Sequence, residues 1–397
     1  MMTSPTIAHL ERELRAGNDD ALHAFWDYVE KEGAPLIEEA DNEEDVLVTF
    51  LWRSDRAEED SILMLGGPAG WNLEQSKLVR LLDTDLYYRT LQTPNRLAAE
   101  YYVSPHDTFG DDWETRLQNL QEDPLNRTFL IHPANPDKPA TKDTAVAVLQ
   151  YPGFAPNLYR AVRSAAPQGE VKQHRLKSSI LENERSVWVY TPPGYRADGD
   201  PYDVLVLFDG FEYDKIVSVP TILDNLIADG KISPIVAVLV NANEHRNEEM
   251  RGTARFAQFA AEEVTAFVRE NYHVSTDPSR AIIGGCSNGG LMGLIVALKH
   301  PTLYGNVLSQ SGAFAWGYEG ESDWFLERLK RWEQVELNIY MDVGSCEKQD
   351  IIGANHSIRD LLIERGASVH FHQFKGGHDW VCWRETFADG LLALIGK

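Results

Sequence analysis

Cysteine and long apolar runs are both scarce in this chain of 397 residues. Its three cysteines, Cys286, Cys346 and Cys382, are too few and too scattered for a disulfide framework or a site of paired metal-binding cysteines. The longest apolar run, residues 291–298, is far shorter than the roughly 20 residues that a transmembrane helix needs. The charged N-terminal segment also lacks the apolar stretch of a secretory signal. We therefore expect a cytoplasmic protein that does not enter the membrane.

Basic residues are scarce as well, with 37 Lys and Arg against 61 Asp and Glu, which gives a net charge of −24. This balance argues against nucleic acid or an anionic membrane as a partner. A small anionic ligand stays compatible with it, because a few local arginines can outweigh the overall charge. Hydrophobic residues make up 43% of the chain, so it can bury a core. The length predicts two domains and leaves the oligomeric state open.

The first part of the chain predicts a small β-rich domain. Residues 7–32 have apolar side chains at helical spacing, which indicates one or two short helices. Four short segments rich in β-branched and aromatic residues predict an antiparallel sandwich; they lie at 45–52, 61–66, 86–91 and 98–103. Residues 107–168 are rich in Pro, Asn and Asp, which predicts an extended surface connector. We expect one domain over 1–165 and a second over 166–397.

The second part alternates strongly apolar strands with helices. This alternation predicts an α/β fold, with a mostly parallel sheet covered by helices on both faces. Strands are expected at 184–191, 203–208, 235–241, 281–284, 305–310, 337–343 and 369–374, and helices at 214–229, 253–272, 289–299, 352–365 and 381–394.

A candidate nucleophile lies in this alternation, in the sequence Gly-Cys-Ser-Asn-Gly at 285–289. It follows an apolar strand and precedes a helix, which is the context of a nucleophile elbow around Ser287. Small residues are needed on both sides because the turn is sharp and brings the strand end against the helix. The alternative is a glycine-rich turn whose serine only caps the helix.

A serine nucleophile needs a base, and His378 is in the right place, in a loop that follows the last predicted strand and contains two glycines. His370 and His372 alternate along that strand, and we interpret them as structural. Backbone amides of Asn288 and Phe211 are the candidate oxyanion donors, because they follow the nucleophile and the strand at 203–208. An ordinary strand-to-helix turn is the alternative at Phe211.

The acid of the triad is expected after the strand at 337–343, where Glu347, Asp350 and Asp342 compete. Only a carboxylate beyond the strand end can reach Nδ1 of the histidine, which favours Glu347, then Asp350, then Asp342.

Several segments together resemble one family, the bacterial enterobactin (enterochelin) esterases of the α/β-hydrolase superfamily. The resemblance is carried by residues 272–312, with the elbow and the later sequence LSQSG, and by GGHDWVCWR at 376–384. It extends to NEHRNEEM at 243–250 and more loosely to FLWR at 50–53 and DPLN at 123–126.

The resemblance implies a serine esterase of α/β-hydrolase fold behind an immunoglobulin-like N-terminal domain. It implies action in the cytoplasm on a ferric catecholate siderophore, the trilactone of 2,3-dihydroxybenzoyl-serine, and no cofactor or resident metal. By matched position it makes Ser287 the nucleophile, His378 the base and Glu347 the acid. The family's arginine near the catecholate pocket falls on Arg246, and Arg251 is a further candidate for attracting the complex.

Two other functions stay open. Feruloyl and acetylxylan esterases share the fold, although their substrates are usually extracellular. A non-catalytic mycolyltransferase-like or carbohydrate-binding protein would use the fold as a scaffold. Trp52, Tyr87 and Tyr88 of the N-terminal domain are candidates either for contact with the substrate or for that domain's own core.

Overall fold

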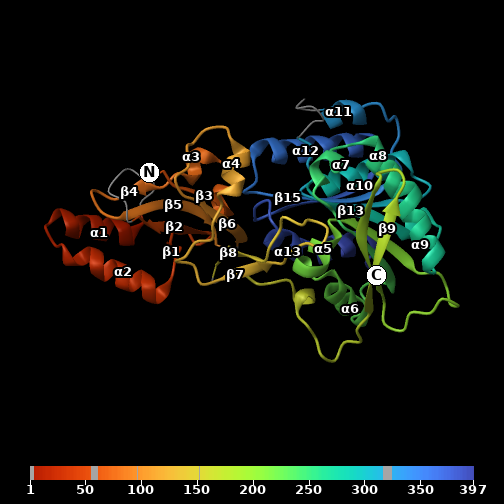
Figure 1. The fold of residues 1–397 in the computed structure, drawn as a ribbon, viewed down its shortest axis with the longest axis horizontal. Helices are drawn as coiled ribbons and strands as arrows, with labels where there is room; N and C mark the ends of the chain where they lie inside the picture. Colours follow the sequence, from red (N-terminus) through yellow and green to blue (C-terminus); the bar gives the residue numbers. More distant parts are fainter. Residues whose placement is uncertain (1–3, 55–60, 96, 152, 316–323) are drawn as a thin grey trace.

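The computed structural model describes residues 4–54, 61–95, 97–151, 153–315 and 324–397. Two small sheets and the helices around them form the N-terminal part, and one large sheet with its helices forms the rest (Figure 1). The two parts lie side by side along the long axis of the molecule (Figure 1). Among the described residues, no helix combines the length and the apolar character needed to cross a membrane.

Two helices open the chain, as predicted: α1 (Pro5–Arg15) and α2 (Asp20–Glu32). Ser4 caps α1, where its hydroxyl accepts a hydrogen bond from the backbone of Ile7 at 3.1 Å. Apolar side chains of both helices pack on one face of the first sheet, against Leu51 and Leu86. This sheet has the order β1-β2-β5-β4; the strands are β1 (Leu36–Glu39), β2 (Asp45–Arg53), β5 (Leu86–Pro94) and β4 (Val79–Arg80).

The other face of the first sheet packs on a second antiparallel sheet. Phe50 of β2 meets Tyr101 of this second sheet, with ring centroids 5.0 Å apart, and both side chains are fully buried. Successive residues of a strand point to opposite faces, so β2 serves both cores. The second sheet has the order β3-β6-β8-β7; the strands are β3 (Leu63–Gly66), β6 (Ala98–Ser104), β8 (Thr144–Gln150) and β7 (Phe129–His132).

The prediction of an extended connector over 107–168 was wrong. This region contains helix α4 (Trp113–Gln118) and strands β7 and β8, and β8 lies inside the second sheet between β6 and β7. Residues 145–149 of β8 are apolar and largely buried, but prolines and asparagines surround them in the sequence. Strand pairing with distant β6 stabilises this segment, and local composition does not report such long-range pairing. After β8 the chain crosses over η2 (Leu158–Arg160) to β9, so the boundary at 165 stays a prediction.

The large sheet has eight strands in the order β16-β15-β14-β13-β11-β12-β10-β9. The strand β10 runs antiparallel to both of its neighbours, and the other pairs are parallel. The sequence missed only β9 among these strands. Their bounds are β9 (Glu170–Ser178), β10 (Asn183–Thr191), β11 (Asp203–Phe208), β12 (Ile235–Val240), β13 (Ala281–Cys286), β14 (Asn306–Gln310), β15 (Asn338–Gly344) and β16 (Ser368–Phe374).

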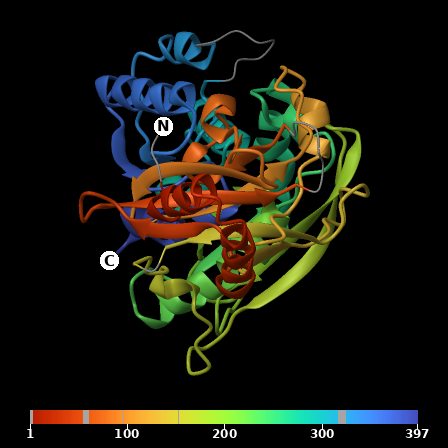
Figure 2. The same cartoon turned by 90° about the vertical axis from the view of Figure 1, so that its left-hand side faces the viewer.

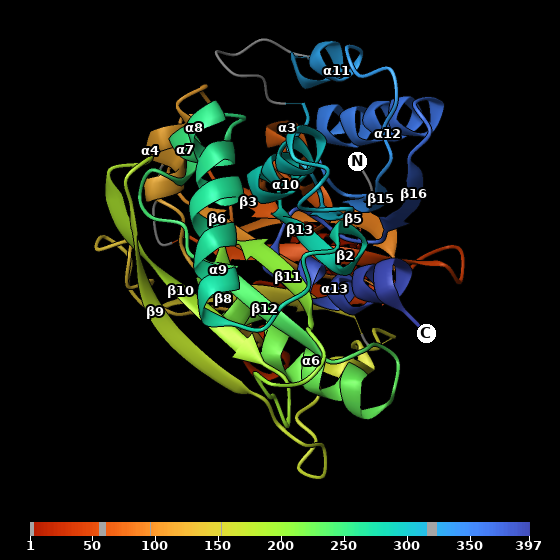
Figure 3. The same cartoon turned by 90° about the vertical axis from the view of Figure 1, so that its right-hand side faces the viewer.

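Helices cover both faces of this sheet, as the continuous apolar strands predict (Figure 3). Leu205 and Leu207 of β11 pack toward α6 and α13, whereas Val204 and Val206 pack toward α8, α9, α10 and α12. The helices are α6 (Val219–Ala228), α13 (Trp380–Ile395), α8 (Ala254–Gln258), α9 (Thr265–Asn271), α10 (Asn288–Lys299) and α12 (Gln349–Glu364), with shorter α5 (Gly210–Glu212), α7 (Arg246–Met250) and α11 (Trp324–Leu329). The short α3 (Leu73–Ser76) belongs to the N-terminal part, where it contacts β3. Two π-helical turns, η3 (Tyr213–Val217) and η4 (Phe259–Val264), precede α6 and α9.

The N-terminal part is joined to the large sheet's domain through polar contacts and a shared core. In the view along the long axis its strands lie in front of the large sheet (Figure 2). The thiol of Cys382 in α13 donates to the carbonyl of Ala98 in β6 at 3.3 Å. The side chains of Asn135 and Asn241 exchange hydrogen bonds across the same boundary. All three cysteines are free thiols.

Candidate active site

The sharp strand-to-helix turn predicted around Ser287 is present between β13 and α10. Ser287 has φ 54° and ψ −119°, a backbone conformation that non-glycine residues rarely adopt. A Cβ on Gly285 would lie 3.2 Å from the backbone of Gly289, so the turn leaves little room for side chains there. The Ser287 side chain makes no hydrogen bond that caps α10. The cap interpretation is therefore not supported, and the strained serine fits an elbow.

His378 and Glu347 are in direct contact, as the sequence predicts. Nδ1 of the histidine lies 2.7 Å from Oε2 of the glutamate, and the glutamate side chain is fully buried. The other carboxylate oxygen, Oε1, accepts hydrogen bonds from Ser311 Oγ at 2.6 Å and from the backbone of Gly344 at 2.7 Å. These bonds fix the carboxylate against the imidazole.

The two competing acids lie elsewhere. Asp350 is exposed in the first turn of α12. Asp342 is buried within β15, where it accepts from Thr386 Oγ1 at 2.7 Å and from the backbone of Ser311 at 3.0 Å. Burial raises the pKa of Asp342 to about 7. The geometry therefore favours Glu347 as the partner of His378.

Trp383 of α13 holds the imidazole from the side. Its ring meets that of His378 edge-on, with centroids 4.9 Å apart, and its Nε1 donates to Ser311 Oγ at 2.9 Å. Ser311 thus joins the indole to Glu347. Ser287, Glu347 and His378 follow β13, β15 and β16, and the carboxyl ends of parallel strands share one edge of a sheet.

The two candidate oxyanion amides lie at helix starts. Asn288 is the first residue of α10 and Phe211 is the second of α5. Amides at these positions have no carbonyl partner within the helix, so both remain candidate donors. In the turn before Phe211 the left-handed conformation belongs to Asp209, with φ 59°, and not to the glycine that follows it. Gly210 instead permits close packing, since a Cβ there would lie 2.2 Å from the backbone of Leu239.

Arg246 makes a bidentate ion pair. Its Nε and Nη2 donate to the two carboxylate oxygens of Asp209 at 2.5 and 2.6 Å. The Nε–Nη2 edge of the guanidinium is therefore engaged by the protein itself. Arg251, just beyond α7, is exposed.

A cavity of about 210 Å³ lies beside His378, between the two parts of the molecule. The N-terminal part contributes Trp71, Tyr102, Glu100 and His132 to its wall, and the catalytic part contributes the loop that carries His378 and the start of α13. Glu100 Oε1 lies 2.9 Å from His132 Nε2, and Tyr102 donates to Glu100 Oε2 at 3.1 Å. The cavity thus offers aromatic walls and paired polar groups next to the candidate base.

The sequence did not predict the residues of this wall, and the aromatic residues that it did predict as candidates lie elsewhere. Tyr87 is buried in the sandwich core, Trp52 packs against the same core, and Tyr88 packs under the N-terminal helices. The available signal was the sequence Gly-Gly-Pro-Ala-Gly before Trp71, which marks a tight turn. A Cβ on Gly70 would lie 2.5 Å from the carbonyl oxygen of Cys346, so glycine lets this turn touch the loop that leads to Glu347.

Asp379, the residue after His378, is a further buried carboxyl at this cavity. Burial and the nearby charge of Glu100 raise its pKa. Its Oδ1 accepts from the backbone of Cys382 at 2.9 Å, which caps α13. This cap fixes the start of the helix that carries Trp383.

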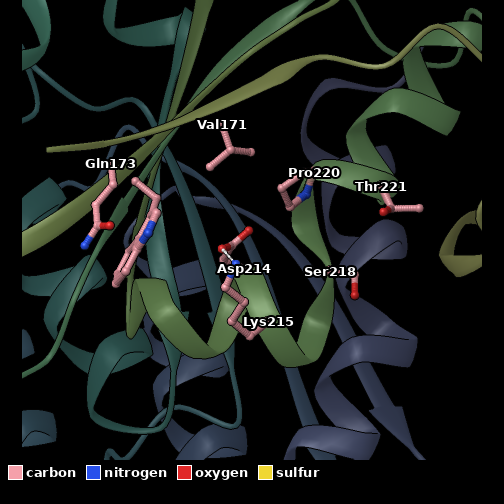
Figure 4. A pocket seen from close by; sticks show the side chains of 8 residues that line it. Val171, Gln173, Asp214, Lys215, Ser218, Pro220 and Thr221 are labelled. Carbon is pink, nitrogen blue, oxygen red and sulfur yellow. Dashed lines mark ion pairs between the residues drawn. The ribbon is translucent and has the colours of Figure 1, made fainter. Parts of the chain in front are cut away.

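A second, more open hollow of about 430 Å³ lies between the edge of the large sheet and the turn before α6 (Figure 4). Val171 and Gln173 line it from β9, and Asp214 and Lys215 line it from η3. It contains none of the triad candidates. Trp188 of its wall packs against Phe211, with ring centroids 5.6 Å apart, so this hollow borders the segment that carries Phe211.

The family described as "Putative esterase" matches residues 178–394, which include the elbow and the His–Glu pair. The chain belongs to this esterase family. The esterase is 26% identical to an iron(III) enterobactin esterase of Dickeya dadantii over 98% of this chain and 95% of that protein. It is 29% identical to an iron(III) enterobactin esterase of Escherichia coli, over 89% and 92% of the two chains.

A solved structure shows the same similarity. The enterobactin esterase of Shigella flexneri, crystallised in the presence of enterobactin, matches this esterase with a TM-score of 0.71 and 26% identity. The match covers 93% of this chain and 97% of that one, so it includes the N-terminal part. The resemblance to enterobactin esterases and the α/β-hydrolase type of fold are confirmed.

Proposed function

We propose that this esterase hydrolyses the ester bonds of an enterobactin-like catecholate siderophore trilactone, as its ferric complex, to release iron in the cytoplasm. The observation that carries the proposal is the His378–Glu347 pair beside a cavity with aromatic walls. Relatives with this substrate in their names match over nearly their whole length, including the part that lines the cavity.

Ser287 is the nucleophile in the proposed reaction. His378 takes the hydroxyl proton through Nε2 as the oxygen attacks a seryl ester carbonyl, and Glu347 holds the Nδ1–H and stabilises the imidazolium. Backbone amides of Asn288 and Phe211 donate to the oxyanion of the tetrahedral intermediate. The alcohol leaves with the proton from His378. Water, deprotonated by the same histidine, then releases the acyl group from Ser287.

The cavity beside His378 would hold one dihydroxybenzoyl arm of the substrate. Its volume of about 210 Å³ exceeds that of engineered protein cavities of roughly 150 Å³ that bind benzene. Trp71 and Tyr102 offer aromatic surface to the ring. Glu100 and His132 offer hydrogen-bonding groups for the catechol hydroxyls of an iron-free arm, since these hydroxyls lose their protons when they bind Fe(III).

Ester hydrolysis has a direct consequence for the metal. A cyclic scaffold holds three catecholates at high effective concentration around Fe(III). Opening or fragmenting the ring removes this preorganisation and weakens the chelate. The iron arrives with the substrate, so the reaction needs no metal held by the protein.

We also propose that the N-terminal domain, residues 1–165, is immunoglobulin-like. Two four-stranded antiparallel sheets packed face to face support this description. A feruloyl or acetylxylan esterase is the alternative function. The names of the relatives that match over nearly the whole chain favour the siderophore.

Product analysis by mass spectrometry tests the proposal. Wild-type protein is incubated separately with the ferric cyclic trilactone, the iron-free trilactone and a feruloylated sugar, and Ser287→Ala serves as the matched inactive control. We expect linear dihydroxybenzoyl-serine oligomers from the trilactone and none with the variant. Release of ferulate without cleavage of either trilactone would overturn the proposal in favour of the alternative.

A further inference from the structure

Two adjacent residues, Arg246 and Asn247, contact both segments that carry the candidate oxyanion amides. Arg246 grips Asp209 with two hydrogen bonds, of 2.5 and 2.6 Å, and Asp209 comes directly before Gly210 and Phe211. Asn247 Oδ1 accepts from Asn288 Nδ2 at 3.0 Å. One dipeptide at the start of α7 therefore connects the segment after β11 with the segment after Ser287.

Asp209 combines a buried side chain with a backbone conformation that is unusual for a non-glycine residue. It is 1% exposed and has a left-handed backbone, with φ 59° and ψ 42°, which costs a non-glycine residue free energy. A Cβ on Gly289 would lie 3.4 Å from Asp209 Oδ2, so the carboxylate also lies against the elbow. A buried carboxylate is stable only when it is paired, and the planar guanidinium pairs with both of its oxygens. The ion pair therefore fixes the backbone at the start of residues 209–211, the segment that carries the candidate amide of Phe211 (the oxyanion segment).

We propose that Arg246 and Asn247 are positioning residues that hold the two oxyanion amides at a fixed separation, and that Arg246 does not bind the substrate anion. The donors of an oxyanion hole must lie within about 2.7–3.1 Å of the developing oxygen, and a displacement of about 1 Å can lower the rate roughly a hundredfold. The proposal rests on the proposed Ser287 esterase mechanism.

The surroundings of Arg246 favour positioning over substrate binding. Its Nη1 lies 3.5 Å from Oδ1 of the neighbouring Asn247, so each of the three guanidinium nitrogens has a contact within the protein. Its side chain is 23% exposed. Among the described residues, those that line the cavity beside His378 do not include Arg246.

Two esters separate the two roles. An arginine that binds catecholate anions affects a catecholate ester but not p-nitrophenyl acetate, which has no such group. A positioning arginine affects both. We expect Arg246→Lys to lower kcat about 10- to 100-fold on p-nitrophenyl acetate and on the iron-free trilactone alike, with KM within about threefold. An unchanged kcat on p-nitrophenyl acetate together with a loss on the trilactone would overturn the proposal.

Arg280→Lys is the matched control. Arg280 Nε pairs with Asp203 Oδ1 at 2.6 Å at the other end of β11, away from the oxyanion segment. We expect this variant to keep kcat on both esters even where its Tm falls. An equal loss of kcat in the control would show that any broken ion pair on β11 has this effect, and would overturn the specific role.

Asn247→Ala tests the contact between Asn247 and Asn288. Because Asn247 is exposed, this variant should fold even if Arg246→Lys does not, and the proposal can still be tested. We expect a loss of about tenfold in kcat on both esters and an equal loss of affinity for a boronic acid, which mimics the tetrahedral intermediate. Unchanged kcat and unchanged boronate affinity would overturn the proposal. Wild type that cleaves p-nitrophenyl acetate but not the trilactone would count against the proposed substrate only.

Discussion

The two parts of this esterase contribute to the site in different ways. The large sheet presents Ser287, Glu347 and His378 on loops at the ends of buried parallel strands. The N-terminal part contributes Trp71, Tyr102, Glu100 and His132 to the cavity beside His378. The groups proposed to react therefore come from one part, and much of the wall proposed to recognise the substrate comes from the other.

Glu347 and Trp71, one residue from each part, also differ in how they are packed. Glu347 is buried and held by three hydrogen bonds from groups of its own domain. Trp71 is partly exposed and touches Tyr102 and Trp113 of the N-terminal part. Substitutions in the catalytic part should therefore mainly change kcat, and substitutions in the N-terminal wall should mainly change KM.

The largest expected effect lies in the catalytic part. Ser287→Ala should lower kcat about 10⁶-fold, and adding His378→Ala should cost little more, because nucleophile and base act as one unit. Steady-state rates on p-nitrophenyl acetate and the trilactone measure this. Ser309→Ala is the control, since Ser309 is a buried serine on β14 outside the proposed triad. Additive losses in the double variant would contradict a shared mechanism.

Glu347→Gln should have the next largest effect, about 10³- to 10⁴-fold in kcat, because the amide no longer stabilises the imidazolium. Asp342→Asn is the matched control and should change kcat less than tenfold, since its side chain contacts Thr386 and Ser311. A larger loss from Asp342→Asn than from Glu347→Gln would move the acid to β15.

Trp71→Ala should raise KM for the trilactone about tenfold, through the loss of aromatic contact worth roughly 1 kcal/mol, and should leave the hydrolysis of p-nitrophenyl acetate unchanged. Trp52→Ala removes an indole that packs against the sandwich core, so it should lower Tm and leave KM unchanged. The two KM values decide between these positions. A rise in KM with Trp52→Ala alone would place recognition on β2.

One buried carboxyl in each part, Asp123 and Asp342, should make the stability of the fold depend on pH, with the smallest effect on activity. Burial raises the pKa of Asp123 to about 6 and that of Asp342 to about 7. The folded state then binds a proton that the unfolded state releases near pH 4, so stability falls as pH rises from about 4 to 6 or 7 and is level above. Asp123→Asn and Asp342→Asn should each reduce this fall by about 1–3 kcal/mol.

Urea unfolding at pH 4.5 and pH 7.5 measures this difference for each variant relative to wild type. The Asp342 effect should extend to higher pH than the Asp123 effect. An identical pH dependence of wild type and both variants would show that neither carboxyl keeps its proton on folding.

The sequence predicted most of the catalytic part because its signals are local. The strand, turn and helix around Ser287 are consecutive, and the glycines of the turn are visible as such. The placement of Glu347 beyond the strand end also followed from the strand's length. The N-terminal strand β8 was missed because its partners are distant in the sequence and its neighbours are typical of loops.

From the sequence alone we could predict the type of fold, the turn at Ser287 and the loops that carry His378 and Glu347, because apolar periodicity and glycine spacing act over a few neighbouring residues. Only the tertiary structure decided which aromatic residues border His378 and what Arg246 holds. Trp71 is far from His378 in the sequence, and Arg246 is far from Asp209. Contacts of this kind depend on how sheets and loops pack, and local composition does not encode that packing.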